Sequence, residues 1–242
     1  MRTIILHYHL FKNAGTSLDR ILQKNFGDGW VTAEFEGKGG DNSGAVADWI
    51  ASTPDAVAYS SHTMLGPVPQ VDGVRVVPIV LLRDPIERIK SAYRFERKQQ
   101  ADTWGAQLAK QHDLAGYVRG RLARPKDRQC RNFQTARLAS MCPGDAPELD
   151  RALQAVEILR ETGVIGRVEA FDNALAQLST RLHDSYPEFT WESTKANVSK
   201  SDSTADISDD LNGLLEESNR DDAALCNAVL NLGTNLLEKN KR

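Results

Sequence analysis

A short stretch near the N-terminus combines residue types that bind phosphate. Residues 9–22 read HLFKNAGTSLDRIL, in which an apolar run leads through a glycine and two hydroxyl residues into a helical pattern. A strand that turns into a helix presents free backbone N–H groups and the positive end of the helix dipole to the turn. Gly15 lets the backbone approach an anion closely, and Thr16 and Ser17 add hydroxyl donors. The stretch therefore predicts an anion-binding loop.

The lysine of this stretch is displaced from its place in nucleoside triphosphatase loops. Those loops follow the pattern G-x-x-x-x-G-K-[ST], in which lysine comes after the last glycine and the hydroxyl binds magnesium. Here Thr16 follows Gly15, and Lys12 stands three residues before the glycine. Lys12 would neutralise charge on a phosphate leaving group without an obligatory metal ion. Taken alone, the stretch is equally compatible with an ordinary strand-to-helix turn.

A second set of phosphate-binding residues follows the apolar run at 74–82. Arg83 comes at the end of that run, Pro85 opens a helical pattern, and Ser91 lies eight residues after Arg83. An arginine at a strand end and a serine on the next helix can hold one phosphate together. The stretch therefore predicts a second phosphate-binding site.

The pair FKNAGTSL and LLRDPIERIKSAY resembles the 5′-phosphosulfate loop and the 3′-phosphate site of sulfotransferases that use 3′-phosphoadenosine-5′-phosphosulfate (PAPS). The likeness is greatest to the carbohydrate branch related to heparan sulfate 2-O-sulfotransferases. Four further segments resemble that branch in the same order: SSHTMLG at 60–66, NFQTARLA at 132–139, VIGRVEAFDNALAQL at 164–178 and NVS at 197–199. The chain departs from the branch at Asn13-Ala14, where Thr-Gly or Thr-Ala is frequent, and in NFQTARLASM, which lacks the usual final glycine.

The resemblance implies a role for each matching residue. The 5′-phosphosulfate would be cradled by Lys12, Asn13, Ala14, Gly15, Thr16 and Ser17, the 3′-phosphate would be bound by Arg83 and Ser91, and Arg137 would contribute to the cofactor cleft. Lys12 and His62 are the expected catalytic residues, because a lysine can stabilise the leaving phosphate and an imidazole can accept the acceptor proton near neutral pH. Glu87 is a weaker candidate for the base. His7 and His9 alternate on the first strand and point to one face, where packing is the plainer interpretation. We expect no metal ion to be needed.

The acceptor is expected to be the hydroxyl of a carbohydrate or glycoconjugate. Seven basic residues and a single acid lie between Arg119 and Arg137, and such a stretch would attract an anionic acceptor such as a uronic-acid-containing or sulfated glycan. The simpler interpretation is that these charges form a solvent-exposed face of a helix. The glycine-rich segment 31–44 is predicted to be a mobile loop of the kind that selects an acceptor.

Alternating strand and helix patterns must position these residues. We predict strands at 3–10, 57–62, 74–82 and within 163–171, and helices at 17–26, 85–100 and 172–184, with two amphipathic helices after residue 207. This order predicts an α/β, P-loop-like three-layer fold with a central parallel β-sheet flanked by helices. A chain of 242 residues is expected to form a single sulfotransferase domain over 1–242.

Composition limits the other classes of function. The net charge of −3 and the pI of about 6.0 argue against a nucleic-acid-binding surface, and no run is long and apolar enough for a membrane span. Cys130, Cys142 and Cys226 are expected to be free thiols in a reducing compartment, so we predict a cytoplasmic protein. Because we find no Golgi-type anchor, we expect a bacterial-type enzyme. Two alternatives stay open: a nucleotide kinase or other phosphoryl transferase with Asp84 on magnesium, and a nucleotide-binding module without catalysis.

Overall fold

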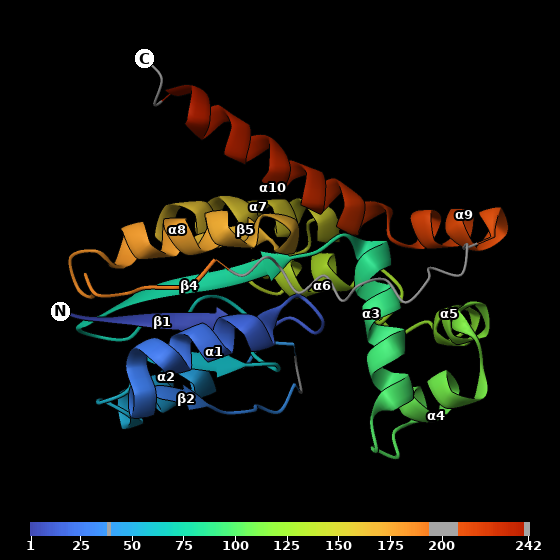
Figure 1. Ribbon diagram of the computed structural model, residues 1–242, viewed down its shortest axis with the longest axis horizontal. Helices are drawn as coiled ribbons and strands as arrows, with labels where there is room; N and C mark the ends of the chain where they lie inside the picture. The colour runs from blue at the N-terminus through green and yellow to red at the C-terminus, as the bar shows by residue number, and fades with distance from the viewer. Residues whose placement is uncertain (38–39, 194–207, 240–242) are drawn as a thin grey trace.

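The protein is built around a five-stranded, all-parallel β-sheet. The computed structural model describes residues 1–37, 40–193 and 208–239, with side chains of the last helix described up to residue 230. The sheet has the order β2-β3-β1-β4-β5 (Figure 1). Its strands are β1 (Arg2–Tyr8), β2 (Trp30–Thr32), β3 (Ala58–Ser61), β4 (Val74–Leu82) and β5 (Val164–Arg167). The first strand of the chain is thus the middle strand of the sheet.

Helices cover both faces of the sheet, which makes a three-layer structure. One face packs on α1 (Gly15–Phe26) and α8 (Phe171–Leu182). The other packs on α2 (Ser43–Ser52), α6 (Phe133–Ala139), α7 (Glu148–Thr162) and α10 (Arg220–Lys239). A third cluster joins α3 (Pro85–Lys98), α4 (Trp104–Gln111), α5 (Leu114–Leu122) and α9 (Asp209–Ser218) beyond the carboxyl ends of the strands (Figure 1). Short 3₁₀ turns occupy Gly27–Gly29 and Val168–Ala170.

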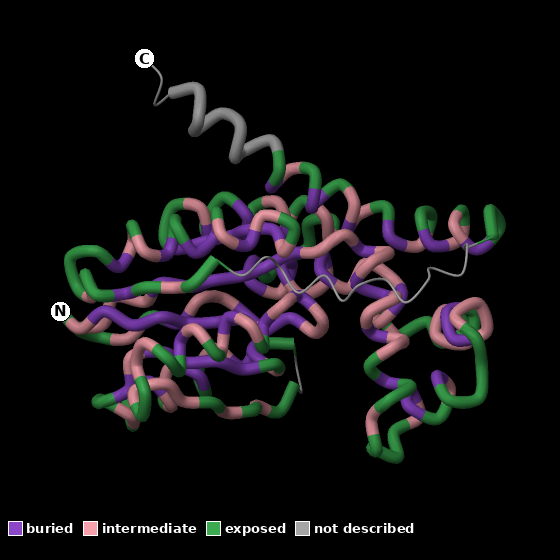
Figure 2. The backbone as a smooth tube through the Cα atoms, in the orientation of Figure 1, coloured by how far each residue is buried: buried purple, intermediate pink, exposed green. Residues whose placement is uncertain are grey.

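The central strand shows how the apolar pattern produces the two faces. Ile4, Leu6 and Tyr8 point into the core beneath α7, while Ile5 points into the core beneath α1. Strands buried on both faces read as nearly continuous apolar runs. His7 interrupts that run on the α1 face and is only 1% exposed, so a buried polar partner is required there. Figure 2 shows the strands as the most buried part of the chain.

The expected α/β architecture with a parallel central sheet is confirmed. The strands predicted at 3–10, 57–62 and 74–82 and the two helices after residue 207 are found. The segment 31–44 is not one loop, because it begins in β2 and ends in α2. The run that starts at Val164 is a strand only to Arg167 and then turns into a 3₁₀ helix. The NVS motif at 197–199 lies outside the described residues.

The three cysteines are free, as expected, and the structure places all three in buried positions. Within the ranges described here, none of the helices combines the length and the apolar character that crossing a bilayer demands.

Candidate active site at the carboxyl edge of the sheet

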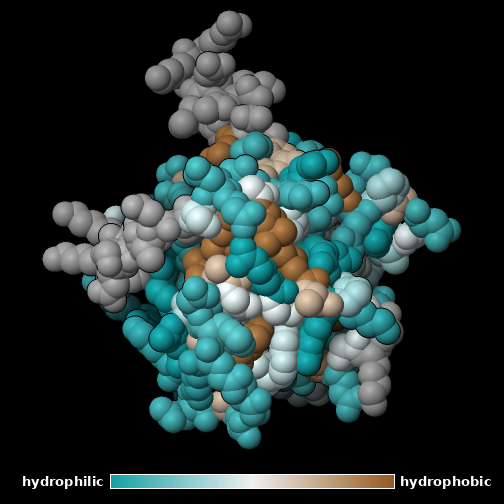
Figure 3. Space-filling model, turned by 90° about the vertical axis from the view of Figure 1, so that its right-hand side faces the viewer, coloured by the Kyte–Doolittle hydropathy of each residue, from teal (hydrophilic) through white to brown (hydrophobic). Residues whose placement is uncertain are grey.

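The residues singled out by sequence meet at the carboxyl ends of three neighbouring strands. His62 follows β3, the loop at 9–14 follows β1, and Arg83 follows β4. These strands lie side by side in the order β3-β1-β4 and all run in the same direction. Open parallel sheets bind ligands at this edge. Figure 3 views the molecule from this side, where hydrophilic residues surround a hydrophobic area near the centre.

The loop between β1 and α1 has the features of an anion cradle. Lys12 and Ala14 both have positive φ angles, of 68° and 59°, which are uncommon for residues other than glycine. Within the described residues, the N–H groups of Ala14, Gly15 and Thr16 donate no hydrogen bond. The hydroxyl of Thr16 is exposed and that of Ser17 half-buried, and neither is paired there. The loop therefore offers several unused donors at the start of a helix.

Asn13 has a different task from its neighbours. Its side chain is buried, and its amide donates to the carbonyl of Leu81 and to Oε1 of Gln134, both at 2.7 Å. Its own N–H donates to the carbonyl of Leu10. All of its N–H donors are thus used within the protein, so Asn13 fixes the loop to β4 and α6 instead of offering a donor to an anion.

Three cationic side chains gather beside the loop. Burial, together with the neighbouring Arg83 and Arg94, lowers the pKa of Lys12. Burial also lowers the pKa of Arg83, against the opposing effect of Glu87 and Glu169. In the part of the chain that the structure describes, Lys12, Arg83 and Arg94 form no ion pair. Half-buried cations that lie together and form no ion pair favour the binding of an anion.

Helix α3 completes this cluster. Asp84 caps the helix by accepting a hydrogen bond of 2.9 Å from the N–H of Glu87, and Pro85 occupies the first turn. Ser91 and Phe95 lie one turn apart on α3, and the Lys12 Nζ is 4.5 Å from the centre of the Phe95 ring. The Ser91 hydroxyl is half-buried and forms no hydrogen bond with the described residues.

His62 is held by a carboxylate that sequence reasoning missed. Its Nδ1 lies 2.7 Å from Oε1 of Glu34, and both side chains are 53% exposed. Thr63 also donates to Glu34, at 2.7 Å, and the hydrogen bonds from Thr63 and His62 outweigh burial and lower the pKa of Glu34. With Nδ1–H donated to a carboxylate, the Nε2 lone pair of His62 is left to accept a proton. Glu87, the weaker candidate for the base, instead pairs with Lys90 at 2.8 Å.

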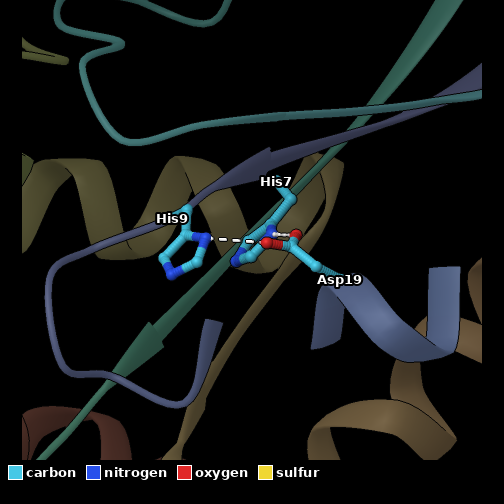
Figure 4. Close-up of side chains that lie close together, drawn as sticks. All are labelled: His7, His9 and Asp19. Atoms are coloured by element: carbon cyan, nitrogen blue, oxygen red, sulfur yellow. Dashed lines mark hydrogen bonds and ion pairs between the residues drawn. The ribbon is translucent and has the colours of Figure 1, made fainter. Parts of the chain in front are cut away.

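His7 and His9 share one carboxylate of α1. Asp19 Oδ1 lies 2.8 Å from His7 Nδ1, and Asp19 Oδ2 lies 2.9 Å from His9 Nδ1 (Figure 4). The two imidazoles point to the same face, as predicted, and burial lowers the pKa of His7. These three side chains are close enough to be considered for a metal ion. Each nitrogen, however, faces a different carboxylate oxygen at hydrogen-bond distance, so two hydrogen bonds account for the arrangement.

Arg137 supports the histidine segment. Its Nη2 donates to the carbonyls of His62 and Met64, at 2.8 and 2.9 Å. Burial lowers its pKa, and the nearby Glu34 acts in the opposite direction. The bonds that the structure gives Arg137 therefore hold the segment after β3 in place, whereas the resemblance implied a contact with the cofactor.

Gln134 connects the two strand ends with the C-terminal helix. Its Nε2 donates a hydrogen bond of 2.9 Å to the carbonyl of Arg83, and its Oε1 accepts one of 2.8 Å from the N–H of the same residue. The N–H groups of Gln134 and Thr135 donate to the buried carboxylate of Asp222, at 3.1 and 2.7 Å. One fully buried amide thus joins β4, α6 and α10 behind the site.

Most basic residues between Arg119 and Arg137 form ion pairs or hydrogen bonds with other residues of the protein. Arg121 pairs with Glu96 at 2.6 Å and with Asp127 at 2.8 Å, and its side chain is only 11% exposed. Arg119 pairs with Asp210, and Arg128 pairs with Glu148. The structure therefore gives the stretch mainly structural partners and leaves Arg124, stacked on Trp104, without a carboxylate among the described residues.

A cavity of about 710 Å³ lies next to the site, between the start of α3 and the turn from α9 to α10. Among the described residues, its charged lining consists of Asp84, Glu216 and Glu217 against the one cation Arg220. This balance of charge is unfavourable for a polyanion, so the cavity is not where phosphate would bind.

Comparison with known proteins gives one close sequence relative. The chain is 39% identical over 206 residues to a protein of Archaeoglobus fulgidus that is named only as an uncharacterized protein, and the match covers 81% of this chain and 80% of the archaeal one. The chain belongs to the family of this archaeal protein. No family model matches the chain, and no solved structure matches it. Membership of this archaeal family brings no activity with it, so the function has to be argued from the geometry of the site.

Proposed function

We propose that the protein is a PAPS-dependent sulfotransferase that acts on a hydroxyl of a carbohydrate or glycoconjugate acceptor. The observation that carries the proposal is a convergence of three features at one sheet edge. They are a loop whose N–H groups have no acceptor among the described residues, three cations that form no ion pair with those residues, and an imidazole held by a carboxylate. The sequence resemblance to the PAPS-dependent enzymes supplies the identity of the donor. The fold alone would be compatible with many activities.

The residues at this edge fit a donor with two separated anionic groups. In this proposal, the loop N–H groups and Lys12 hold one anionic group at the start of α1, and Arg83 at the end of β4 holds the other with Ser91 of α3. Lys12 and Arg83 are tied together, because the guanidinium of Arg83 donates 3.2 Å to the carbonyl of Lys12. A 3′-phosphate at the second locus would distinguish PAPS from ADP and ATP.

The side chains then have separable tasks in transfer. PAPS, when bound, supplies the sulfuryl group and a phosphate as the leaving group. Lys12 stabilises negative charge on the leaving oxygen, and the loop N–H groups do the same without needing to reorganise. His62 accepts the acceptor proton at Nε2, while Glu34 holds the ring in the required tautomer and stabilises the imidazolium that results.

The phosphoryl-transferase alternative requires a carboxylate free to bind magnesium. Asp84 is the carboxylate in the expected place, but its Oδ1 caps α3. It also faces the cavity beside α9 and α10. Recruiting Asp84 to a metal would remove that cap at a cost of about 1 kcal/mol. The site therefore favours a reaction without a metal ion, in which Lys12 provides the positive charge.

The proposal is tested by calorimetric binding of adenosine 3′,5′-bisphosphate, compared with ADP and ATP, without magnesium. Arg83→Ala should weaken binding of the bisphosphate by about 1.5–3 kcal/mol, which corresponds to a roughly 10- to 150-fold higher Kd. Arg75→Ala is the matched control, because Arg75 lies on the same strand at the opposite end of the sheet. The control should bind like the wild type. A preference for ATP that depends on magnesium would overturn the proposal in favour of phosphoryl transfer.

A further inference from the structure

A second histidine lies between the proposed base and the anion loop. The ring of His9 is centred 3.9 Å from the ring of His62. The same ring packs directly on Gly15, because a Cβ built on Gly15 would lie 2.3 Å from Nε2 of His9. His9 therefore touches both halves of the site, the segment after β3 and the first residue of α1.

Asp19 determines which atom of His9 is available. The Nδ1 of His9 is engaged with Asp19 Oδ2, so only Nε2 can interact with a bound molecule. Asp19 belongs to α1, the helix whose start forms the anion loop. The helix that presents the N–H groups to an anion thus also orients the imidazole beside them.

We propose that His9 is a second catalytic residue, an imidazole whose Nε2 takes up a proton when an anion binds at the loop and then donates a hydrogen bond to it. The proposal rests on the proposed function, because the anion in question is the phosphosulfate end of the donor. A neutral ring held through Nδ1–H would turn a lone pair toward the anion, which is unfavourable. A proton on Nε2 changes that lone pair into a charged donor.

The groups that face His9 favour the addition of one proton to its ring. Asp19 of α1 is the counter-charge: burial alone would raise its pKa, but the hydrogen bonds from His7 and His9 dominate and lower it well below its usual value. On β1, His7 shares that carboxylate, and burial lowers the pKa of His7, which keeps its ring neutral. From the segment after β3, His62 packs against His9 with its ring tilted by 31°, and it has its own carboxylate in Glu34.

This arrangement divides acid and base between two neighbouring imidazoles. In the transfer step, the bond between sulfur and the leaving phosphate oxygen breaks and its electron pair stays on that oxygen, which Lys12 and the Nε2–H of His9 stabilise. The new sulfur–oxygen bond forms to the acceptor oxygen, whose proton passes to Nε2 of His62. Enzymes often assign the acid and base roles to two titratable groups whose different surroundings separate their pKa values.

Proton uptake on binding tests this assignment without any turnover. Adenosine 3′,5′-bisphosphate is titrated by calorimetry at pH 7.5 in buffers of different ionisation enthalpy, which gives the number of protons taken up. We expect the wild type and His62→Gln to take up a proton on binding, and His9→Gln to bind the same ligand with uptake abolished. His183→Gln, on the exposed end of α8, is the control and should behave like the wild type.

The outcomes separate the two proposals. Absence of bisphosphate binding to the wild type contradicts the proposed function itself. Tight binding with no proton uptake, or with uptake that persists in His9→Gln, overturns the role of His9 and leaves the sulfotransferase proposal standing. Should His9→Gln fail to fold, ¹⁵N NMR of the wild-type imidazoles decides the matter. Binding must convert the His9 Nε2 signal from the unprotonated to the protonated range, and an unchanged signal refutes the proposal.

Discussion

Replacing Gly15 with alanine should damage the fold and the site together, because the His9 ring occupies the space that a side chain would need. A Cβ at position 15 would lie 2.1 Å from Cδ2, 2.3 Å from Nε2 and 2.5 Å from Cγ of His9. Ordinary contacts begin near 3.4 Å, so the ring or the start of α1 would have to move by about 1 Å. The ring cannot retreat freely, because Asp19 holds its Nδ1 at 2.9 Å.

The expected cost is the sum of two effects. Forcing an extra methyl group into a packed site costs about 1–3 kcal/mol. Loss of a hydrogen bond to a carboxylate adds about 1.5–3 kcal/mol if the ring swings away. Since the backbone can absorb part of the clash, we expect a total of about 2–4 kcal/mol. For a chain of this length, that corresponds to a fall in Tm of roughly 4–16 °C.

Denaturant unfolding and thermal unfolding of Gly15→Ala measure this cost. Gly44→Ala is the matched control: Gly44 lies in the first turn of α2 with nothing within 4 Å of its added Cβ, and its stability should change by less than about 1 kcal/mol. The double variant Gly15→Ala/His9→Ala should be less destabilised than the two single changes added together, because removing the ring removes the clash. A Gly15→Ala protein as stable as the Gly44→Ala control, or strict additivity in the double variant, would refute the packing argument.

Three other predictions concern the charged residues. Glu34→Gln should lower kcat by about 10²-fold, with little change in the Kd of the bisphosphate, because the carboxylate that fixes the His62 tautomer is lost. Steady-state kinetics and calorimetry check this against Glu188→Gln, an exposed carboxylate on another surface, and equal losses in both variants would contradict the role of Glu34. Arg121→Ala should destabilise the fold by about 3–5 kcal/mol, because it strands Glu96 and Asp127, whereas Arg124→Ala should cost no more than about 1 kcal/mol. Urea unfolding of both variants is the measurement, and similar stabilities would show that the Arg121 pairs contribute little. The pKa of Asp19 is lower in the folded protein than in the unfolded chain, so the unfolded chain binds more protons on acidification. The contribution of Asp19 to the free energy of unfolding is therefore fully present above its unfolded pKa of about 3.8 and is lost as the pH falls below that value. The stability advantage of the wild type over Asp19→Asn should therefore shrink between pH 5 and pH 3, and an advantage that grows on acidification would contradict this sign.

The sequence predicted the parts of the fold that depend on local pattern. The apolar run at 74–82 is β4 to the residue, and Pro85 marks the first turn of α3. Parallel strands have aligned carboxyl ends, so the residues after them could be expected to meet once the sheet was assumed. The order of the strands could not be derived in this way, because it depends on long-range packing of helices that carry no signal for their neighbours.

Sequence reasoning missed the partners that orient the site. Glu34 lies in a segment rich in glycine, with no motif that points to His62, and only β2 brings it alongside the end of β3. Asp19 could have been noticed, because it lies four residues after Gly15 on the same helix face as the loop. Asn13 and Arg137 belong to motifs with an expected ligand role, yet their donors bind backbone carbonyls and a buried amide. The type of residue was informative, whereas the direction of its side chain depended on the fold.

The buried Gln134 amide has a consequence for how the two ends of the chain depend on each other. Asp222 of α10 accepts the N–H groups that begin α6, and α6 carries the amide that binds both Asn13 of the loop and the backbone of Arg83. A chain cut before α10 would deprive those N–H groups of their carboxylate acceptor and uncover the start of α6. We therefore expect such a truncation to disturb the loop at 9–14, although more than two hundred residues separate this loop from Asp222 along the chain. The C-terminal helix is thus part of the framework that holds the candidate site.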